Sequence, residues 1–428
     1  MCHRPSLYGS YFFHRTMIFC FLTLAYALAF LHRMSPAVVA TEIMRDFQSS
    51  SAIMGLLASA YFYPYAFMQA PCGILTDKLG TRKLVTIALV MAALSCAVFS
   101  MSESVTGAFL SRMSVGFGLA LVLVPANKAL ARWFTPKDFI LAASTLLAIA
   151  TGAGVLLAGT PLALLCSAVG WRNSFTGIAG LTLLAGVGVW LFVRDTPQDL
   201  GFSQQQKDNT EKNENTLHPT GHIKTISLIL SKRNFWSVAF TFMLTTPIFF
   251  SFAGLWAGVY LTEVGGLSHT TMGTVISASG LLSAAAPICF ASIARKVASR
   301  KSMVVAIAAI TLLTLIWAIL RNGSWSGLEI SLWFGIFSFV CTAPPGLYFT
   351  TVKELYPLAI SGTATGLLYA MPMLLSALYQ PLVGWLLDTG QEGILPTAET
   401  FQPVFLFFCL SAAAALLAAL SMNEKQAL

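Results

Sequence analysis

The chain has 428 residues, of which 56% are hydrophobic and 10% are charged, and its mean hydropathy is +0.75. A typical soluble domain has about 45 to 50% apolar and about 25% charged residues, so this composition excludes an ordinary soluble protein. The net charge of +8 does not indicate nucleic-acid binding, because Lys and Arg collect on one side of the predicted membrane spans.

Apolar stretches of about 20 residues, the length that crosses a hydrocarbon core, recur along the whole chain. They predict spans at 17–40, 52–76, 84–101, 106–130, 140–165, 172–193, 236–262, 271–294, 302–320, 328–350, 360–387 and 401–421. We therefore expect an all-α membrane protein with twelve transmembrane helices. The first stretch is too long for a signal peptide and is interpreted as a permanent span.

A polar linker at 194–235 separates two predicted six-helix bundles, 1–193 and 236–428. Its central part has almost nothing apolar to bury, so we expect it to be mobile and cytoplasmic. Counted over alternate connections, 20 Lys and Arg residues lie on one side of the predicted spans and 3 on the other. By the positive-inside rule both termini are cytoplasmic, and the chain is expected to be a multi-pass protein of a bacterial inner membrane.

A charged turn, residues 73–83, joins the second predicted span to the third. Moving 218 positions along the chain gives residues 291–301, which again lie between apolar stretches, and Arg82-Lys83 then superposes on Arg300-Lys301. This repeat indicates a duplicated unit. Transporters are often built in this way, with the substrate site between the halves and near the bilayer midplane.

The turn resembles the signature loop GxLxDxxGxRK of the major facilitator superfamily. The matching residues are Gly73, Asp77, Gly80, Arg82 and Lys83, with Lys78 inside the motif. Further resemblance comes from the RxxxGxG pattern at 112–118, from Gly-Trp-Arg at 170–172, and from residues 353–357 and 362–366. The chain is similar to the bacterial sugar-phosphate permease and sensor group and to lysosomal-type dipeptide carriers, and no motif separates these branches.

This resemblance implies the two-bundle fold of the superfamily and a gating role for the loop. Asp77 would face the N-terminus of the eleventh span, near Ser361 and Gly362, when the cytoplasmic side is closed. The second copy of the loop has Arg295 in place of Asp77, so the two halves would be gated unequally.

Arg33 and Arg112 lie inside predicted spans, where a charged group costs about 2.5 to 3.5 kcal/mol. Each could instead reach the membrane interface or brace neighbouring helices. The guanidinium of Arg33 suits a carboxylate or a phosphate. In the organophosphate carriers that the chain resembles, an arginine of the first span binds the anion, but the partner arginine of their seventh span is absent from 249–256. A singly anionic or zwitterionic solute is therefore favoured over a phosphate.

Polar and aromatic residues recur at helical spacing in two predicted spans. Tyr61, Tyr65 and Gln69 share one face of the second span, and Tyr369 and Gln380 can face the interior from the eleventh. They predict the lining of a solute path, although tight packing between helices would produce the same pattern. With Arg33 and Arg112, these residues form the predicted substrate-binding set.

No Asp or Glu lies in the middle of a predicted span, so a carboxylate proton relay is not expected. This favours facilitated diffusion, exchange, or proton coupling through the substrate or Arg112, a position that the superfamily associates with proton transfer. His32, next to Arg33, is interpreted as structural. The antiporter motif GxxxxxxxxGxxxGP is poorly matched in the fifth span, which argues against drug export.

Enzymatic motifs are missing. The sequence has no Gly-Lys pair and therefore no Walker A loop, and it has neither HExxH nor GxSxG. We therefore expect no enzymatic activity, no cofactor and no metal.

The sequence predicts a secondary or facilitative transporter of a small organic acid, amino acid, dipeptide or phosphorylated metabolite, working by alternating access. A transporter-like solute sensor that signals through a partner protein, and a lipid-facing scaffold or flippase, are the alternatives. The expected partners are the solute and membrane lipids, without nucleic acid, and the chain is expected to be monomeric.

Overall fold

The computed structural model describes residues 5–202, 222–294, 296–297, 299–343, 345–390 and 395–422. These residues are almost entirely helical and include no strand. The helices of the first half are α1 Pro5–Met34, α2 Pro36–Asp46, α3 Ser51–Ser59, α4 Phe62–Ser100, α5 Val105–Ala120, α6 Leu123–Trp133, α7 Pro136–Ala158 and α8 Thr160–Phe192.

The second half begins after a 3₁₀ turn, η1 Pro197–Leu200, and the short helix α9 His222–Leu230. Its helices are α10 Arg233–Ser251, α11 Ala257–Val259, α12 His269–Ala294, α13 Arg300–Arg321, α14 Gly327–Thr342, α15 Pro345–Leu355, α16 Leu358–Asp388 and α17 Ala398–Leu420, and two π-helical segments, η3 Phe252–Trp256 and η4 Tyr260–Val264, flank α11.

Ten helical stretches of the described chain are long and apolar enough to cross a membrane. Their number differs from the predicted twelve partly because successive spans run together. One stretch, Leu141–Phe192, has 52 residues and turns at Gly170, where φ is 79°. The prediction of apolar membrane-spanning helices is confirmed, whereas the exact count of twelve stays a prediction.

α4 contains most of the predicted second span and nearly all of the third. The chain turns sharply between them at Gly80. The Gly80 φ of 77° lies in the left-handed region, which favours glycine. A Cβ at this position would also lie 2.6 Å from the carboxylate of Asp195. That carboxylate accepts a hydrogen bond of 3.0 Å from the Arg82 backbone N–H, so the turn is fastened to the segment after α8.

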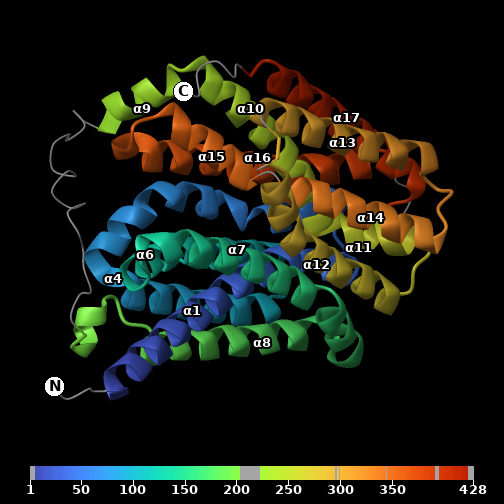
Figure 1. The fold of residues 1–428 in the computed structure, drawn as a ribbon. Helices are drawn as coiled ribbons and strands as arrows, with labels where there is room; N and C mark the ends of the chain where they lie inside the picture. Colours follow the sequence, from blue (N-terminus) through green and yellow to red (C-terminus); the bar gives the residue numbers. More distant parts are fainter. Residues whose placement is uncertain are drawn as a thin grey trace.

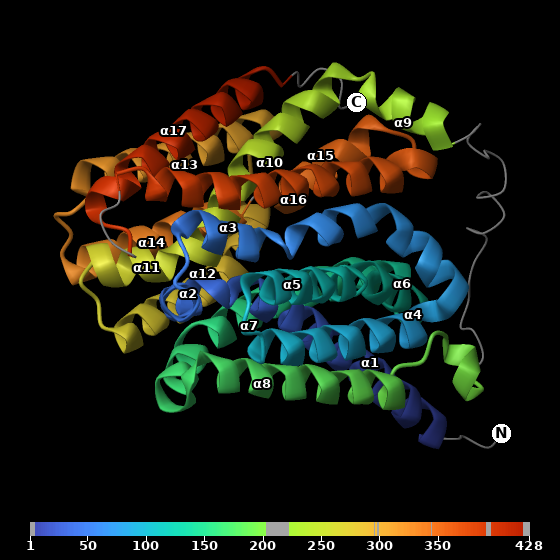
Figure 2. The same ribbon diagram turned by 180° about the vertical axis from the view of Figure 1, so that it is seen from behind.

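Figure 1 shows helices α1 to α8, coloured blue to green, gathered in the lower part of the molecule and the yellow-to-red helices largely above them. α3 and α4 pack on α16, α7 and α8 pack on α12, and α2 packs on η3 and α11. Helices from both halves therefore bury a common apolar core between them, and the view from behind in Figure 2 shows α3 and α4 beside α16.

The molecule has two ends, which we name the Asp77 end and the Asp388 end after the residues they carry. At the Asp388 end the halves touch through backbone, because added Cβ atoms at Gly384 and Gly258 would overlap the carbonyl oxygens of Ser51 and Ala37. At the Asp77 end, Gly362 and Gly366 of the same helix α16 have nothing within 4 Å of an added Cβ. The tight backbone contact between α16 and α3 extends from Gly384 to Gln380, whose carbonyl oxygen an added Cβ at Gly55 would overlap.

The predicted linker, 194–235, contains ordered structure at its two edges. Residues 197–200 form η1, and α9 packs on the second half through Ile229, which is fully buried. The Ile229 carbonyl accepts a hydrogen bond of 2.7 Å from the Tyr356 hydroxyl. The apolar residues of α9 provide the packing surface that the central part of the linker lacks, and that part, 203–221, lies outside the described residues.

Candidate functional site

Arg33 lies near the end of α1, next to a break that the sequence itself explains. Pro36 has no backbone N–H, so it cannot donate to the carbonyl of His32 four residues earlier, and its ring disfavours a continuous helix. α1 accordingly ends at Met34 and α2 begins at Pro36. The break meets the second half at Gly254 of η3, whose added Cβ would lie 3.9 Å from the Arg33 carbonyl oxygen.

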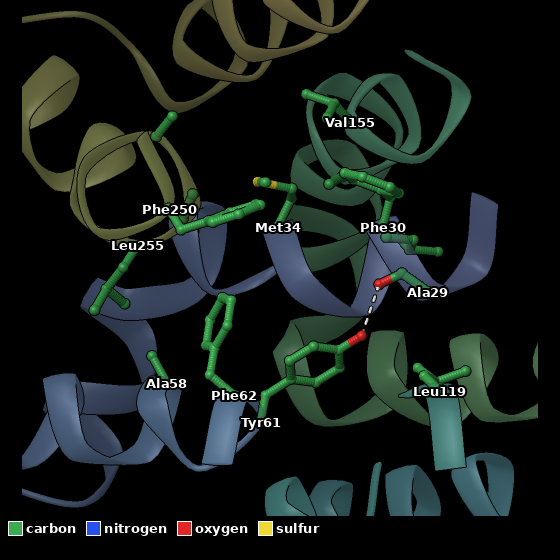
Figure 3. Packing of buried hydrophobic residues seen from close by; sticks show 14 of the residues in the cluster. Ala29, Phe30, Met34, Ala58, Tyr61, Phe62, Leu119, Val155, Phe250 and Leu255 are labelled. Atoms are coloured by element: carbon green, nitrogen blue, oxygen red, sulfur yellow. Dashed lines mark hydrogen bonds between the residues drawn. The ribbon is translucent and has the colours of Figure 1, made fainter. Parts of the chain in front are cut away.

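The Arg33 guanidinium is enclosed by aromatic rings. Its Cζ lies 4.5 Å from the ring centre of Tyr65, and four further rings lie within 5.0 to 5.8 Å. We call these five residues and Arg33 the arginine cage: Phe30, Tyr61, Phe62, Tyr65 and Phe250 are its rings. Figure 3 shows Phe62 and Phe250 close together where the two halves meet, with ring centres 5.5 Å apart.

Arg33 is 1% exposed. The Tyr61 and Tyr65 hydroxyls lie beside its guanidinium, but among the described residues Nε, Nη1 and Nη2 have no partner at normal hydrogen-bond geometry. Cation–π contacts contribute about 0.5 to 2 kcal/mol each, but they leave the N–H groups unsatisfied, which is costly for a buried charge. The Tyr65 hydroxyl beside it is also buried without a partner. The cage therefore presents fixed N–H and O–H donors suited to an anion.

The second half contributes uncharged polar atoms near the cage. Gln380, 1% exposed, donates from Nε2 to the Phe250 carbonyl at 3.1 Å, which leaves its Oε1 unpaired. This carbonyl lies two residues before η3, where the helical hydrogen bonds shift from i−4 to i−5 and a carbonyl loses its helical donor. The buried hydroxyl of Ser251 is likewise unpaired.

Arg112 lies in α5, and its side chain binds the backbone at the break between α1 and α2. Its Nη1 donates to the His32 carbonyl at 3.1 Å, the acceptor that Pro36 leaves without a helical partner, and the Ser35 hydroxyl donates to the same oxygen at 3.2 Å. Arg112 also borders a small void of about 10 Å³, lined only by residues of the first half. That volume holds about one water molecule and is far too small for a sugar-sized solute.

The His32 side chain points away from the cage into the first half. Its Nε2 lies 3.1 Å from the Thr182 hydroxyl of α8, and the residue is fully buried. Successive residues of a helix point about 100° apart, which explains why Arg33 faces the second half whereas His32 does not.

The other predicted site residues are spread more widely. Tyr61 stacks on Tyr65 with ring centres 5.6 Å apart and donates to the Ala29 carbonyl at 3.4 Å, the dashed contact in Figure 3. Tyr369 of α16 is close enough to Arg33 to interact with it electrostatically. Gln69 donates to the Tyr65 carbonyl of its own helix at 3.4 Å, and among the described residues its side chain forms no further hydrogen bond, ion pair or ring contact with the side chains of the cage.

Four residues close to Arg33 were missed from the sequence: Tyr26, Phe30, Phe62 and Phe250. Tyr26 lies seven positions before Arg33, which is two helical turns and so the same face. This spacing in the sequence could have predicted that Tyr26 lies near Arg33. Phe250 has no comparable local signal, because it reaches the cage only through the packing of the two halves.

In the predicted gating motif, the carboxylate of Asp77 forms an ion pair with Lys128 in the middle of α6, and the Asp77 side chain is 67% exposed. Both residues belong to the first half. Arg82 stacks on Trp190, with Cζ 4.1 Å from the ring centre. The approach of Asp77 to the start of α16 in a state with a closed cytoplasmic side stays a prediction. Arg295, the residue of the second copy, lies outside the described residues.

The sequence matches the profile of the Major Facilitator Superfamily over residues 22–371. Among curated proteins, the galacturonate transporter of Dickeya chrysanthemi is 26% identical over 255 residues, which cover 58% of this chain and 72% of that one. The hexuronate transporter of Escherichia coli (strain K12) is 24% identical over 257 residues, which cover 59% of each chain. The match therefore spans about three fifths of the latter protein.

A probable galactarate/D-glucarate transporter of Escherichia coli (strain K12) is 27% identical over 289 residues, covering 62% of this chain and 64% of the other. Among solved structures, a bacterial homologue of the human lysosomal transporter Spinster, inward-facing and unoccupied, aligns with a TM-score of 0.74 at 17% identity over 98% of both chains. A D-xylose-proton symporter aligns with a TM-score of 0.75 at 14% identity over 96% of this chain and 97% of the other. At these identities the structural similarity concerns the fold.

Proposed function

The chain belongs to the major facilitator superfamily, and from this premise we propose that it carries a sugar acid across a membrane, with Arg33 binding the carboxylate. As a member of this family the protein is a membrane transporter of a small molecule and not an enzyme. The names of the relatives, which are carriers of galacturonate, hexuronates and galactarate, support an acidic sugar as the solute.

The observation that carries the proposal is the buried, unpaired guanidinium of Arg33 at the junction of the halves. A carboxylate accepts two parallel hydrogen bonds from a guanidinium, and such charge-assisted bonds are about twice as strong as neutral ones. The rings of the cage suit the C–H faces of a sugar, and Gln380 Oε1 and Ser251 Oγ can bond its hydroxyl groups. Tyr65 and Tyr369 complete the proposed binding set on opposite halves.

In this proposal Arg112 and Gln69 assist transport without binding the carboxylate at the cage. Arg112 holds the break beside Arg33 through the His32 carbonyl, and Gln69 lies one turn beyond Tyr65 toward the Asp77 end, where it would meet the solute on its way out. The transport mode left open by the sequence, namely diffusion, exchange or proton coupling, remains open within the proposal.

The orientation follows from the distribution of Lys and Arg, 20 against 3. With the Asp77 end cytoplasmic, the Asp388 end is periplasmic and the protein lies in a bacterial inner membrane. In this proposal the tight contact of α3 with α16 near Asp388 closes the periplasmic side, which supports an inward-facing state. The halves 1–193 and 236–428 would rock about the cage during transport, with the loop from Gly73 to Lys83 closing the cytoplasmic side.

The test is uptake of radiolabelled D-galacturonate by proteoliposomes that contain only this protein. We expect saturable uptake by the parent, loss of at least 100-fold in Arg33→Gln, and a smaller loss in Arg33→Lys, because lysine keeps the charge without the planar fork. Arg15→Gln, which removes a half-buried arginine outside the cage that stacks on Phe134, is the matched control.

Equal uptake by the parent and Arg33→Gln would show that Arg33 is not the carboxylate site. Tight binding of galacturonate without any uptake would favour the alternative of a solute sensor. If neither binding nor uptake of galacturonate or other sugar acids occurs, the assignment of the solute class is wrong.

A further inference from the structure

We infer that the site selects sugar acids with a single carboxylate and discriminates against the dicarboxylates of the same carbon chain. This inference rests on the proposed function and adds the charge of the substrate. Relatives of both kinds exist, because the names of the similar carriers include monoanionic hexuronates as well as the dianions galactarate and D-glucarate. Similarity alone therefore does not decide between them.

The first argument is the charge that faces the bound solute. The five rings of the arginine cage are uncharged, and so are the nearby polar groups of Tyr369, Ser251 and Gln380. Arg33 thus supplies a net charge of +1 with all three of its nitrogens available. One carboxylate neutralises this charge and satisfies the guanidinium at the same time.

The second argument is that the opposite wall has no cation for another carboxylate. The sequence from Asn234 to Val264, which forms most of α10 and both π segments, contains no Lys, Arg or His, and neither does α16 from Leu358 to Asp388. The unpaired groups on this side, Gln380 Oε1 and Ser251 Oγ, can serve hydroxyls. A carboxylate that meets the Gln380 oxygen would be buried without a counter-ion, which is strongly unfavourable.

The third argument is that the other buried arginine is already used. Arg112 lies 5.8 Å from the ring centre of Tyr61 and Arg33 lies 5.4 Å from the same ring, so the two guanidinium groups are near each other. However, Nη1 of Arg112 donates to the His32 carbonyl, and Arg112 lines the small apolar void of the first half. None of the residues that line this void is a ring of the arginine cage.

The test is a ligand series with one galacto configuration and zero, one or two carboxylates: D-galactose, D-galacturonate, D-galactonate and galactarate. Binding to the purified full-length protein in detergent at neutral pH is measured by isothermal titration calorimetry. We expect at least one of the two monocarboxylates to bind at least tenfold more tightly than galactarate, and galactose not to bind.

A preference below tenfold, or tighter binding of galactarate, overturns this inference while leaving the proposed transport of sugar acids intact. Absence of binding by all four ligands overturns the proposed function together with the inference. Arg112→Leu provides a second readout that does not depend on the absolute affinity. We expect the ratio of the two affinities to stay unchanged in this variant, and a selective loss of galactarate binding would identify Arg112 as a second anion site and contradict the inference.

Discussion

The carboxylate of Asp388 accepts a hydrogen bond of 2.8 Å from the backbone N–H of Ser51, although 337 positions separate the two residues. Its second oxygen accepts from the Ala52 N–H at 3.0 Å. Ser51 begins α3 and Asp388 ends α16, so one half supplies an anion to the free N–H groups and positive dipole end of a helix in the other. This contact joins the halves at the Asp388 end only.

Asp388→Asn should weaken this closure. Hydrogen bonds to a charged acceptor contribute about 1.5 to 3 kcal/mol and neutral ones about 1 kcal/mol, and the amide keeps only one acceptor oxygen. We expect Ala58→Cys, a buried position of α3 seven residues after Ser51, to react with a membrane-impermeant maleimide about tenfold faster in Asp388→Asn than in the parent. Both are prepared without the native cysteines.

Glu399→Gln is the matched control, because Glu399 is an exposed carboxylate in the first turn of α17. It should leave the reaction rate unchanged. Equal maleimide reaction rates in Asp388→Asn and the parent would show that the hydrogen bonds of Asp388 to α3 do not stabilise the closed Asp388 end.

Gly384→Ala should open the same end by a steric route. The added Cβ would overlap the Ser51 carbonyl, and backbone cannot move aside as a flexible side chain can. In the same labelling assay we expect faster modification of Ala58→Cys. Gly366→Ala, in the same helix but with nothing within 4 Å, should behave like the parent in this state, and a similar effect of both changes would contradict the packing explanation.

Arg112 and Pro36 should be energetically coupled through the His32 carbonyl. Replacing Pro36 with Ala restores a backbone N–H that can donate to this carbonyl, so Arg112 is no longer its needed partner. We expect Arg112→Leu to cost about 1 kcal/mol more in the parent than in the Pro36→Ala background. A double-mutant cycle of unfolding free energies in detergent measures the difference, and additive effects would rule out the shared acceptor.

Gln380→Leu should lower sugar-acid affinity about five- to tenfold, since one neutral hydrogen bond contributes about 1 to 1.5 kcal/mol. Gln380→Glu should lower it further, because it places a negative charge near the carboxylate-binding Arg33 and loses the donor to the Phe250 carbonyl. Calorimetry with D-galacturonate measures both changes. Ser376→Ala, whose hydroxyl only bonds the Pro372 carbonyl of its own helix, is the control, and equal affinities across all variants would remove Gln380 from the site.

Composition and hydropathy determined the class of this protein without any tertiary information. Stretches of about 20 apolar residues have to form helices in a membrane, because no water is present to satisfy their backbone groups. The charged turn from Gly73 to Lys83 indicated the family, which the sequence profile supports over residues 22–371. The cost of a charge inside a span singled out Arg33.

The surroundings of Arg33 were decided only by the tertiary structure. Phe250 and Gln380 come from helices more than 200 positions further along the chain, and packing between halves carries no local periodicity in the sequence. The same holds for Arg112, which the sequence presented as equivalent to Arg33. Its partner is a backbone carbonyl released by Pro36 in another helix, and such a pairing depends on how α1 and α5 lie together in space.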